Sequence, residues 1–137
     1  MAAAADRVGV TVNPGDAVLI GTGWSRRWDD RDAFVGQDDG VPGIDPSAAQ
    51  WCIDHGVRIA GGETIAFEQI KAGAGHSLLP VHRMFLVDHG INIVETMRLA
   101  PLLDLDVAEC LLVLAPLNVL GATGGPVRPL ALVAGQG

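Results

Sequence analysis

Short, mostly apolar runs recur along this chain and limit the folds that it can adopt. The runs occupy residues 17–20, 57–60, 91–94, 110–114 and 130–133. Each is only four or five residues long and lacks the strict apolar–polar alternation of a half-exposed strand, so each predicts a buried strand. Strands buried on both faces need helices to cover them. The pattern therefore predicts a layered α/β fold.

Helix start and stop signals lie between these runs. Asp45 stands at an N-cap position with Pro46 directly after it, and this helix should end near Gly56, where glycine can adopt the left-handed conformation. A second helix should begin at Pro80, run to about residue 88 and end at Gly90. Shorter helical segments are predicted at residues 2–8 and 32–34, and residues 102–107 form either a turn or a short helix. Residues 61–75 carry mixed signals typical of a loop.

Composition indicates a compact protein without affinity for nucleic acid. The chain has 137 residues, of which 49% are hydrophobic and only 18% charged, so it is long and apolar enough to bury the core of one domain spanning residues 1–137. The net charge is −7, with no cluster of Lys and Arg. Because attraction to phosphate drives nucleic-acid binding, a nucleic-acid partner is not expected.

The sequence predicts a cytoplasmic protein with no membrane segment. The longest apolar run, residues 110–117, is too short to cross a bilayer and contains Pro116. The N-terminus lacks the basic and apolar stretches of a secretory signal. Cys52 and Cys110 could pair, but without such a signal we expect free, buried thiols.

Several blocks, taken in order, resemble the cyclase family of metal-dependent hydrolases, the group that includes bacterial kynurenine formamidase (arylformamidase). The blocks are PGDAVLIGTGW at 14–24, GVRIAG at 56–61, LPVHR at 79–83, GINIVE at 90–95, LAPL at 114–117 and GATGGPVRP at 121–129. Each block is short, but their order and spacing agree over nearly the whole chain.

The resemblance implies a layered β/β/α, swivelling fold with a mixed, barrel-like sheet. In the family, the main metal motif, of the form H-x-G-T-H-x-D-x-P-x-H, lies upstream of the equivalent of Pro14. No such motif occurs in this chain. The resemblance therefore implies the C-terminal portion of a cyclase, with the N-terminal portion missing.

The resemblance also places two metal ligands, a histidine and a glutamate, at His82 and Glu95, with zinc or manganese as the metal. Read without the family, His82 lies on a predicted helix and Glu95 ends the next strand, so a turn at Gly90 can bring them together. A His and a Glu thirteen positions apart are no motif by themselves, and most such pairs are ordinary surface or core groups. Catalytic zinc sites moreover use three protein ligands.

Other polar and aromatic residues are open to two interpretations. Trp24 either lines an apolar substrate pocket or belongs to the core, and Arg128 either anchors a substrate carboxylate or bonds a backbone carbonyl. Glu63 stands where the family usually has Asp, and Gly125 where it usually has Ser, so a substrate-lining loop could differ. The remaining histidines are predicted to be loop or helix-end residues; they are His55, His76 and His89.

The resemblance implies hydrolysis of a small-molecule amide, such as the N-formylkynurenine of tryptophan catabolism to kynurenine, or of a cyclic amide or lactone. The metal would activate water and polarise the carbonyl. The alternative is a catalytically inactive, truncated cyclase-like domain that acts as a structural or oligomerising module. Because removing part of a layered fold exposes strand edges and apolar faces, a homo-oligomer is expected.

Overall fold

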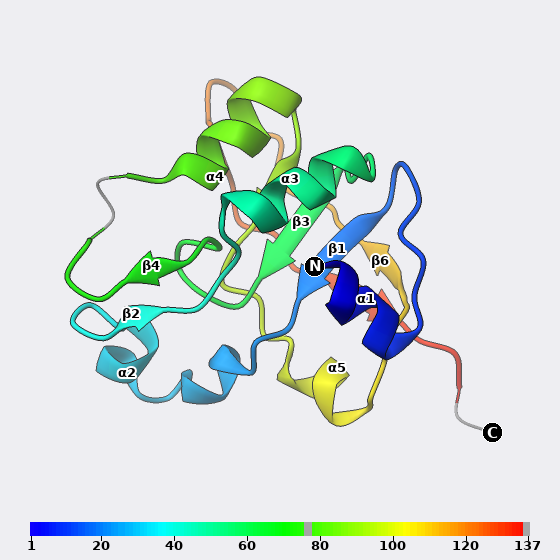
Figure 1. Ribbon diagram of the computed structural model, residues 1–137, viewed down its shortest axis with the longest axis horizontal. Helices are drawn as coiled ribbons and strands as arrows, with labels where there is room; N and C mark the ends of the chain where they lie inside the picture. The colour runs from blue at the N-terminus through cyan, green and yellow to red at the C-terminus, as the bar shows by residue number, and fades with distance from the viewer. Residues whose placement is uncertain (76–77, 136–137) are drawn as a thin grey trace.

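The protein is built from three small β-sheets and the helices that connect and cover them (Figure 1). The computed structural model describes residues 1–75 and 78–135. The elements in chain order are α1 (Ala2–Val8), β1 (Ala17–Ile20), η1 (Trp24–Arg27), α2 (Arg31–Val35), β2 (Gly40–Val41), α3 (Pro46–Asp54), β3 (Ile59–Gly62), β4 (Ile70–Lys71), α4 (Pro80–His82), η2 (Arg83–His89), β5 (Asn92–Val94), α5 (Ala100–Asp104), β6 (Leu111–Val113) and β7 (Leu130–Leu132).

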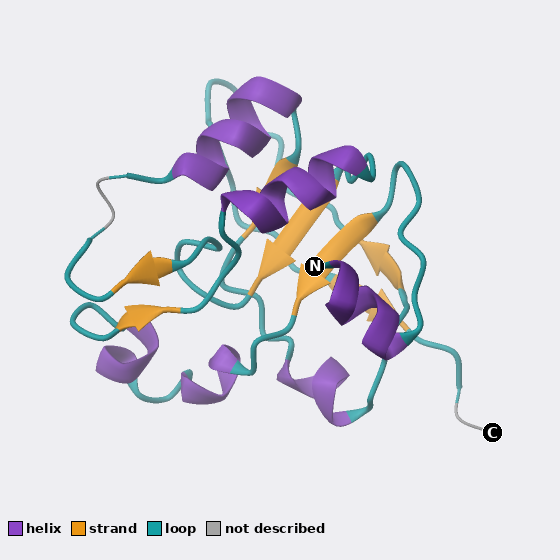
Figure 2. Ribbon diagram, in the orientation of Figure 1, coloured by secondary structure: helices purple, strands orange, loops and turns teal. Residues whose placement is uncertain are grey.

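The central sheet is parallel, with strand order β1–β3–β5. The connection from β1 to β3 contains α3, and the connection from β3 to β5 contains α4 and η2. These helices pack against one another and lie beside the sheet (Figure 2). Because the strands are parallel, the residues that follow them meet at one edge, where ligands of open α/β sheets commonly bind.

The main core lies between this sheet and its helices. Val18 and Ala60 from the strands pack with Cys52 from α3 and with Val81 and Phe85 from the second helix. Phe85 is fully buried, and burial of such a side chain stabilises the fold by about 2–3 kcal/mol. Burial also raises the pKa of the Cys52 thiol to about 11, so this cysteine stays protonated at neutral pH.

Both main helices form as predicted. The Asp45 side chain accepts a hydrogen bond from the Ala48 amide (2.9 Å) and caps α3. The second helix runs from Pro80 through π-helical turns to His89 and ends at Gly90, which has a φ of 64°. The predicted segments at 2–8, 32–34 and 102–107 correspond to α1, α2 and α5, with shifts of a few residues at the ends.

β1 coincides with its apolar run, β5, β6 and β7 are one or two residues shorter than theirs, and β3 is shifted toward the C-terminus. β3 starts at Ile59 rather than at residue 57, because the Val57 amide bonds the Cys52 carbonyl at the end of α3. The region 61–75, interpreted as a loop, contains β4, which pairs antiparallel with β2. Both thiols are free as expected, but Cys110 is only half-buried.

The barrel-like sheet expected from the resemblance is absent from residues 1–75 and 78–135. The strands there form one parallel sheet and two separate two-stranded antiparallel sheets, β2–β4 and β6–β7, and no closed barrel. β6 and β7 pair only with each other in this part of the chain, so they do not extend the central sheet. In the same part of the chain, no helix is both long and apolar enough to cross a bilayer.

Glu63, directly after β3, joins the ends of the two neighbouring strands. Its side chain is 1% exposed and accepts hydrogen bonds from the Thr22 amide (2.7 Å) and the Ser25 hydroxyl (2.5 Å), among others. Burial alone would raise the pKa of this carboxyl, but the hydrogen bonds from Ser25, Thr22 and the backbone outweigh burial and leave the pKa below its ordinary value. The ionised carboxylate therefore fixes the β1–η1 turn against β3.

Replacing Glu63 with Gln should destabilise the protein in a pH-dependent way. Because the folded-state pKa is depressed, the stabilisation is complete above the unfolded-state pKa of about 4.3 and is lost as pH falls through the folded-state value. At pH 7 the variant should lose about 2–3 kcal/mol of unfolding free energy, measured by urea denaturation. Between pH 5 and pH 3 the wild type should lose stability more steeply than the variant, and parallel pH curves would contradict this role.

Candidate metal site

The imidazole of His82 lies between two carboxylates. Its Nδ1 is 2.7 Å from Oε1 of Glu68, and its Nε2 is 3.1 Å from Oε1 of Glu95. The side chains of His82 and Glu95 are 23% and 36% exposed, whereas that of Glu68 is 3% exposed. One side of the ring thus faces the protein interior, and the other is reachable from solvent.

The fold brings His82 and Glu95 together as the sequence predicts. His82 is the last residue of α4, and Glu95 follows β5 at the carboxyl edge of the parallel sheet. The helix between them ends at Gly90, where a left-handed backbone returns the chain to β5. The metal-ligand role of the two side chains remains a prediction.

Glu68 is a site residue that the sequence did not reveal. Its carboxylate accepts hydrogen bonds from the backbone amides of Val81 (3.1 Å) and His82 (3.0 Å). The residue at the N-cap position of α4, Leu79, provides no side-chain cap, so Glu68 satisfies the amides at this helix start from a distant part of the chain. An acidic residue within the largely apolar segment 65–70 was the signal, because a buried carboxylate requires donors.

Close backbone contacts fix the segment that carries Glu68. The Gln69 amide bonds the Ile44 carbonyl (3.0 Å), and Ile44 and Glu68 form an isolated parallel bridge. At Gly43 a Cβ atom would collide with the backbone of residues 67–69. Phe67 has a φ of 57° and buries its ring 5.9 Å from that of Phe85, centroid to centroid. A left-handed conformation is unfavourable for a bulky residue, so the surrounding packing must impose it.

The donors present suit part of a metal site. Two ligands of a tetrahedral zinc ion lie about 3.3–3.6 Å apart, given metal–ligand distances of about 2.0–2.2 Å. The 3.1 Å between Nε2 of His82 and Oε1 of Glu95 is slightly below that range, so a small outward movement of either side chain would admit an ion. Within residues 1–75 and 78–135, no group of three or more His, Cys, Asp or Glu side chains is placed to hold a metal. This chain thus supplies at most part of a complete ligand set.

Trp24 and Arg128, the two candidate substrate-binding residues, have surroundings different from those of His82 and Glu95. The Trp24 indole donates to the Phe34 carbonyl (2.8 Å), its ring lies under the Arg27 guanidinium, and it packs against a small core cluster. Arg128 is exposed in the connection between β6 and β7. Neither residue shares a hydrogen bond or ion pair with His82 or Glu95 in the described part of the chain, and their substrate roles remain predictions.

The other histidines that the structure describes are helix-end residues, as expected. His55 caps α3 and is stacked on Trp51, whose carbonyl lies 2.8 Å from its Nδ1, and His89 ends η2. His76 lies outside the described residues. Among the histidines that the structure describes, His82 is therefore the one whose two ring nitrogens each contact a carboxylate.

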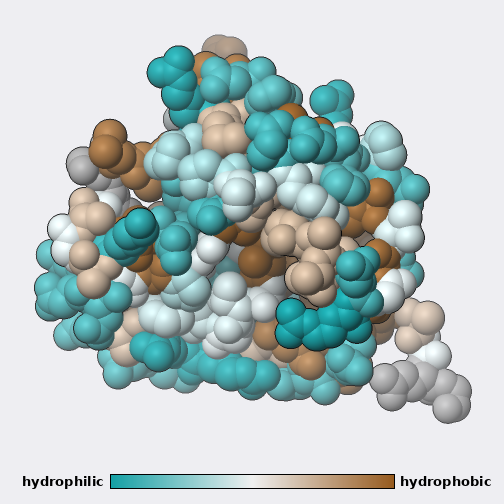
Figure 3. Space-filling model, viewed as in Figure 1, coloured by the Kyte–Doolittle hydropathy of each residue, from teal (hydrophilic) through white to brown (hydrophobic). Residues whose placement is uncertain are grey.

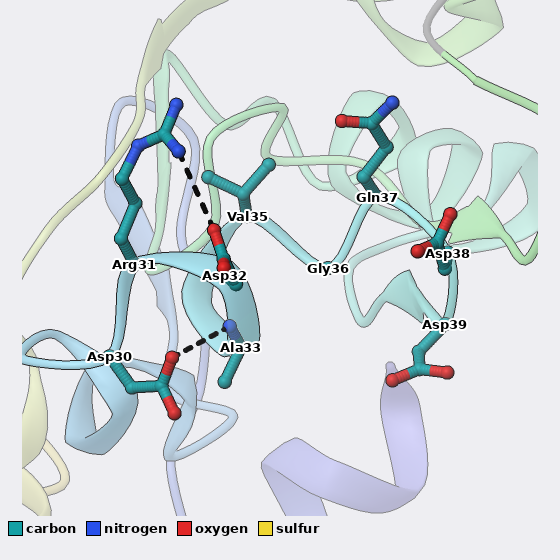
Figure 4. Close-up of a pocket in the computed structure, with 9 residues that line it drawn as sticks. All are labelled: Asp30, Arg31, Asp32, Ala33, Val35, Gly36, Gln37, Asp38 and Asp39. Atoms are coloured by element: carbon teal, nitrogen blue, oxygen red, sulfur yellow. Dashed lines mark hydrogen bonds and ion pairs between the residues drawn. The ribbon is translucent and has the colours of Figure 1, made fainter.

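A surface hollow around α2 does not contribute to this site. It is lined by residues from the single stretch 30–39, and Figure 4 shows Asp38 and Asp39 on the opposite side of the hollow from the Arg31–Asp32 pair. None of its lining residues belongs to the cluster of Glu68, His82 and Glu95.

The geometry defines an α/β protein with a parallel sheet and with an imidazole and a carboxylate near the sheet's carboxyl edge, and the comparisons define the class further. The protein-family model described as "Putative cyclase" matches residues 1–69. The isatin hydrolase of Roseibium aggregatum is 30% identical over 125 residues, which cover 89% of this chain and 46% of that protein.

Solved structures match almost the whole chain. A structure described as a novel cyclase superposes with a TM-score of 0.80 at 27% identity, covering 95% of this chain and 44% of that one. An isatin hydrolase bound to the product analogue thioisatinate gives 0.78 at 27% identity, with coverages of 96% and 50%. A predicted metal-dependent hydrolase from Bacillus stearothermophilus gives 0.65 at 30% identity, with coverages of 92% and 54%.

This chain belongs to the cyclase family. The match confirms the resemblance found in the sequence and the mixed α/β fold that it implied. The chain spans about half the length of the relatives that it matches, in agreement with the expected partial match. The structural matches extend over the segment that carries His82 and Glu95, beyond the residues matched by the protein-family model.

Replacing Gly43 with Ala should disturb the support of Glu68. The added Cβ meets backbone rather than a flexible side chain, so we expect a loss of about 1–3 kcal/mol in the free energy of unfolding, measured by urea denaturation. Gly124→Ala is the matched control, because nothing lies within 4 Å of a Cβ atom there. Equal stabilities for the two variants would show that the close approach at Gly43 is unimportant.

Proposed function

We propose that this chain contributes two ligands to the metal site of a hydrolase that cleaves small-molecule amides. The observation that carries the proposal is the convergence of His82 Nε2 and Glu95 Oε1 at 3.1 Å on the solvent-accessible side of the ring. The similarity to proteins described as metal-dependent hydrolases supports a divalent metal in general. An imidazole nitrogen and a carboxylate oxygen suit zinc or manganese.

The role of the chain's own residues is to bind and orient. His82 would present a neutral nitrogen and Glu95 an anionic oxygen, so together they would balance half of the charge of a divalent ion. When bound, such an ion activates water and polarises a carbonyl. Further ligands would come from a segment carrying the family's H-x-G-T-H-x-D motif, which is consistent with relatives about twice as long as this chain.

The substrates that we propose share one chemical feature, an amide carbonyl whose nitrogen is attached to an aromatic ring. Isatin has this amide within a ring, and N-formylkynurenine has it as a formamide. Isatin is favoured, because isatin hydrolases are among the similar proteins. Trp24 remains a candidate for contact with the aromatic ring of either substrate, and Arg128 for contact with the carboxylate of N-formylkynurenine. The cytoplasm is the expected location.

Metal affinity tests the proposed ligands directly. Zn²⁺ or Mn²⁺ is titrated, with calorimetry as the readout, into the chain mixed with a polypeptide that carries the H-x-G-T-H-x-D segment. His82→Ala and Glu95→Ala should each weaken binding by roughly 100-fold, because loss of a ligand costs at least as much as the 10–100-fold effects typical of outer-shell residues. His89→Ala is the matched control, because this histidine is on the same helix without a carboxylate partner among the described contacts. Binding that is equally tight in all variants would refute the ligand assignment.

Activity is measured separately, with isatin and N-formylkynurenine as substrates. We expect turnover above background only when the chain is combined with a polypeptide that carries the H-x-G-T-H-x-D segment. Turnover that is unaffected by His82→Ala in that mixture would contradict a role of this site in the reaction.

A second proposal, self-association, rests on the apolar C-terminal segment. From residue 100 to residue 135 no residue is buried, although large apolar side chains are frequent there. The exposed ones are Leu103, Leu105, Leu111, Val113, Leu117, Val119, Leu120, Leu130, Leu132 and Val133. Figure 3 shows apolar side chains reaching the surface in the region where β6 lies in Figure 1. Apolar surface of this extent typically marks an interface.

Light scattering tests this second proposal. The wild-type chain should form a homo-oligomer, and the double variant Leu111→Lys, Leu132→Lys should be monomeric, because these residues face each other across β6 and β7. Val87→Lys, on exposed η2, is the control that should leave the assembly intact. A monomeric wild-type chain would contradict the proposal.

A further inference from the structure

We propose that Glu68 is a positioning residue that holds the His82 ring with its Nδ1 protonated and its Nε2 free for a metal. The inference rests on the proposed function, because it concerns how a ligand of that site is oriented. It goes beyond the two ligands themselves, since Glu68 lies on the opposite side of the ring from Glu95.

The proton on the ring follows from the chemistry of the two partners. A carboxylate only accepts hydrogen bonds, so the contacts of both ring nitrogens call for a proton, and the neutral ring has one, for which the 2.7 Å contact between Nδ1 and Glu68 Oε1 competes best. This contact is buried on the Glu68 side, and it is shorter than the 3.1 Å contact of Nε2 with the more exposed Glu95. In the neutral ring, the proton should therefore reside on Nδ1, which leaves the Nε2 lone pair directed toward Glu95.

The orientation of the ring follows from a shared acceptor. Oε1 of Glu68 accepts from both the backbone amide (3.0 Å) and the ring Nδ1 of His82, so one oxygen ties the side chain to its own backbone. Oε2 accepts from the Val81 amide (3.1 Å), which fixes the plane of the carboxylate. Rotation of the ring away from this position would break a charge-assisted hydrogen bond in a buried environment.

A carboxylate performs this task better than an amide of the same size. The side chain of Gln can turn its NH₂ group toward Nδ1 and donate, which would move the ring proton to Nε2, the nitrogen that the metal needs. The negative charge of Glu68 also makes the imidazole a stronger donor to a cation. Carboxylate partners of metal-binding histidines typically change metal affinity by 10–100-fold.

The first readout is the tautomer of His82 in the metal-free protein. Two-bond ¹H–¹⁵N correlation spectra of the imidazoles, recorded at a pH at which the ring is neutral, should show the Nδ1–H form in the wild type and a shift toward the Nε2–H form in Glu68→Gln. A wild-type ring in the Nε2–H form would overturn the proposal.

The second readout is the affinity for Mn²⁺ and for Zn²⁺. Glu68→Gln should bind each metal 10–100-fold more weakly than the wild type. Glu63→Gln is the matched control, because Glu63 is also a buried carboxylate that accepts hydrogen bonds from backbone amides but touches no histidine. It should lower stability while leaving both the tautomer and the metal affinity unchanged.

The outcomes separate this inference from the proposed function. If the wild type shows the Nδ1–H form but its mixture with a polypeptide that carries the H-x-G-T-H-x-D segment binds neither metal, the positioning role stands and the proposed function fails. If the wild type binds metal and Glu68→Gln binds it equally well, the positioning role fails and the ligand assignment stands. If Glu68→Gln does not fold, Glu68→Asp replaces it: the shorter carboxylate should keep the tautomer but weaken the metal affinity, and an unchanged affinity would overturn the proposal.

Discussion

The candidate site depends on a buried carboxylate, Glu68, that has no Lys or Arg partner among the described ion pairs. Glu68 accepts hydrogen bonds from the amides at the start of α4 and from the ring of His82. The Glu68 carboxylate thus connects the first turn of the helix to the imidazole ring. A buried charge without partners would be very costly, and these donors are what allow it to stay in the interior. Glu63, five residues earlier, is likewise a buried carboxylate held by hydrogen-bond donors, which are the amides and hydroxyls of the β1–η1 turn. The connection that follows β3 thus fixes both the strand edge and the helix that carries His82.

Much of the architecture could be predicted from local signals, whereas the support of the site could not. Asp45, Pro46 and Gly90 marked the helix ends correctly because capping and left-handed turns are set by neighbouring residues. The proximity of His82 and Glu95 could be predicted because the first lies on a helix and the second follows a strand, and a tight turn joins the two elements. Glu68 was missed because its partners are more than twelve positions away and its loop conformation, with Phe67 in the left-handed region, is imposed by tertiary packing. The barrel-like sheet was expected from the family alone, and the short strands of the described residues do not form it.

Two observations support the proposal that further metal ligands come from outside this chain. Its described residues offer no group of three or more metal-binding side chains, and the segment after residue 100 leaves its apolar side chains exposed. Both agree with a chain that spans about half the length of its cyclase relatives. Either a second polypeptide segment or a second copy of the chain would cover the exposed apolar surface. Only a segment with further metal-binding side chains would complete a metal site.

The most direct test of the central claim is a crystal structure of the chain soaked with Mn²⁺, with anomalous scattering used to locate the ion. The account predicts an anomalous peak about 2.0–2.2 Å from both His82 Nε2 and Glu95 Oε1, with Glu68 still bonded to Nδ1. A well-diffracting soaked crystal with no peak between those two atoms, or with the ring turned so that Nε2 faces Glu68, would contradict it.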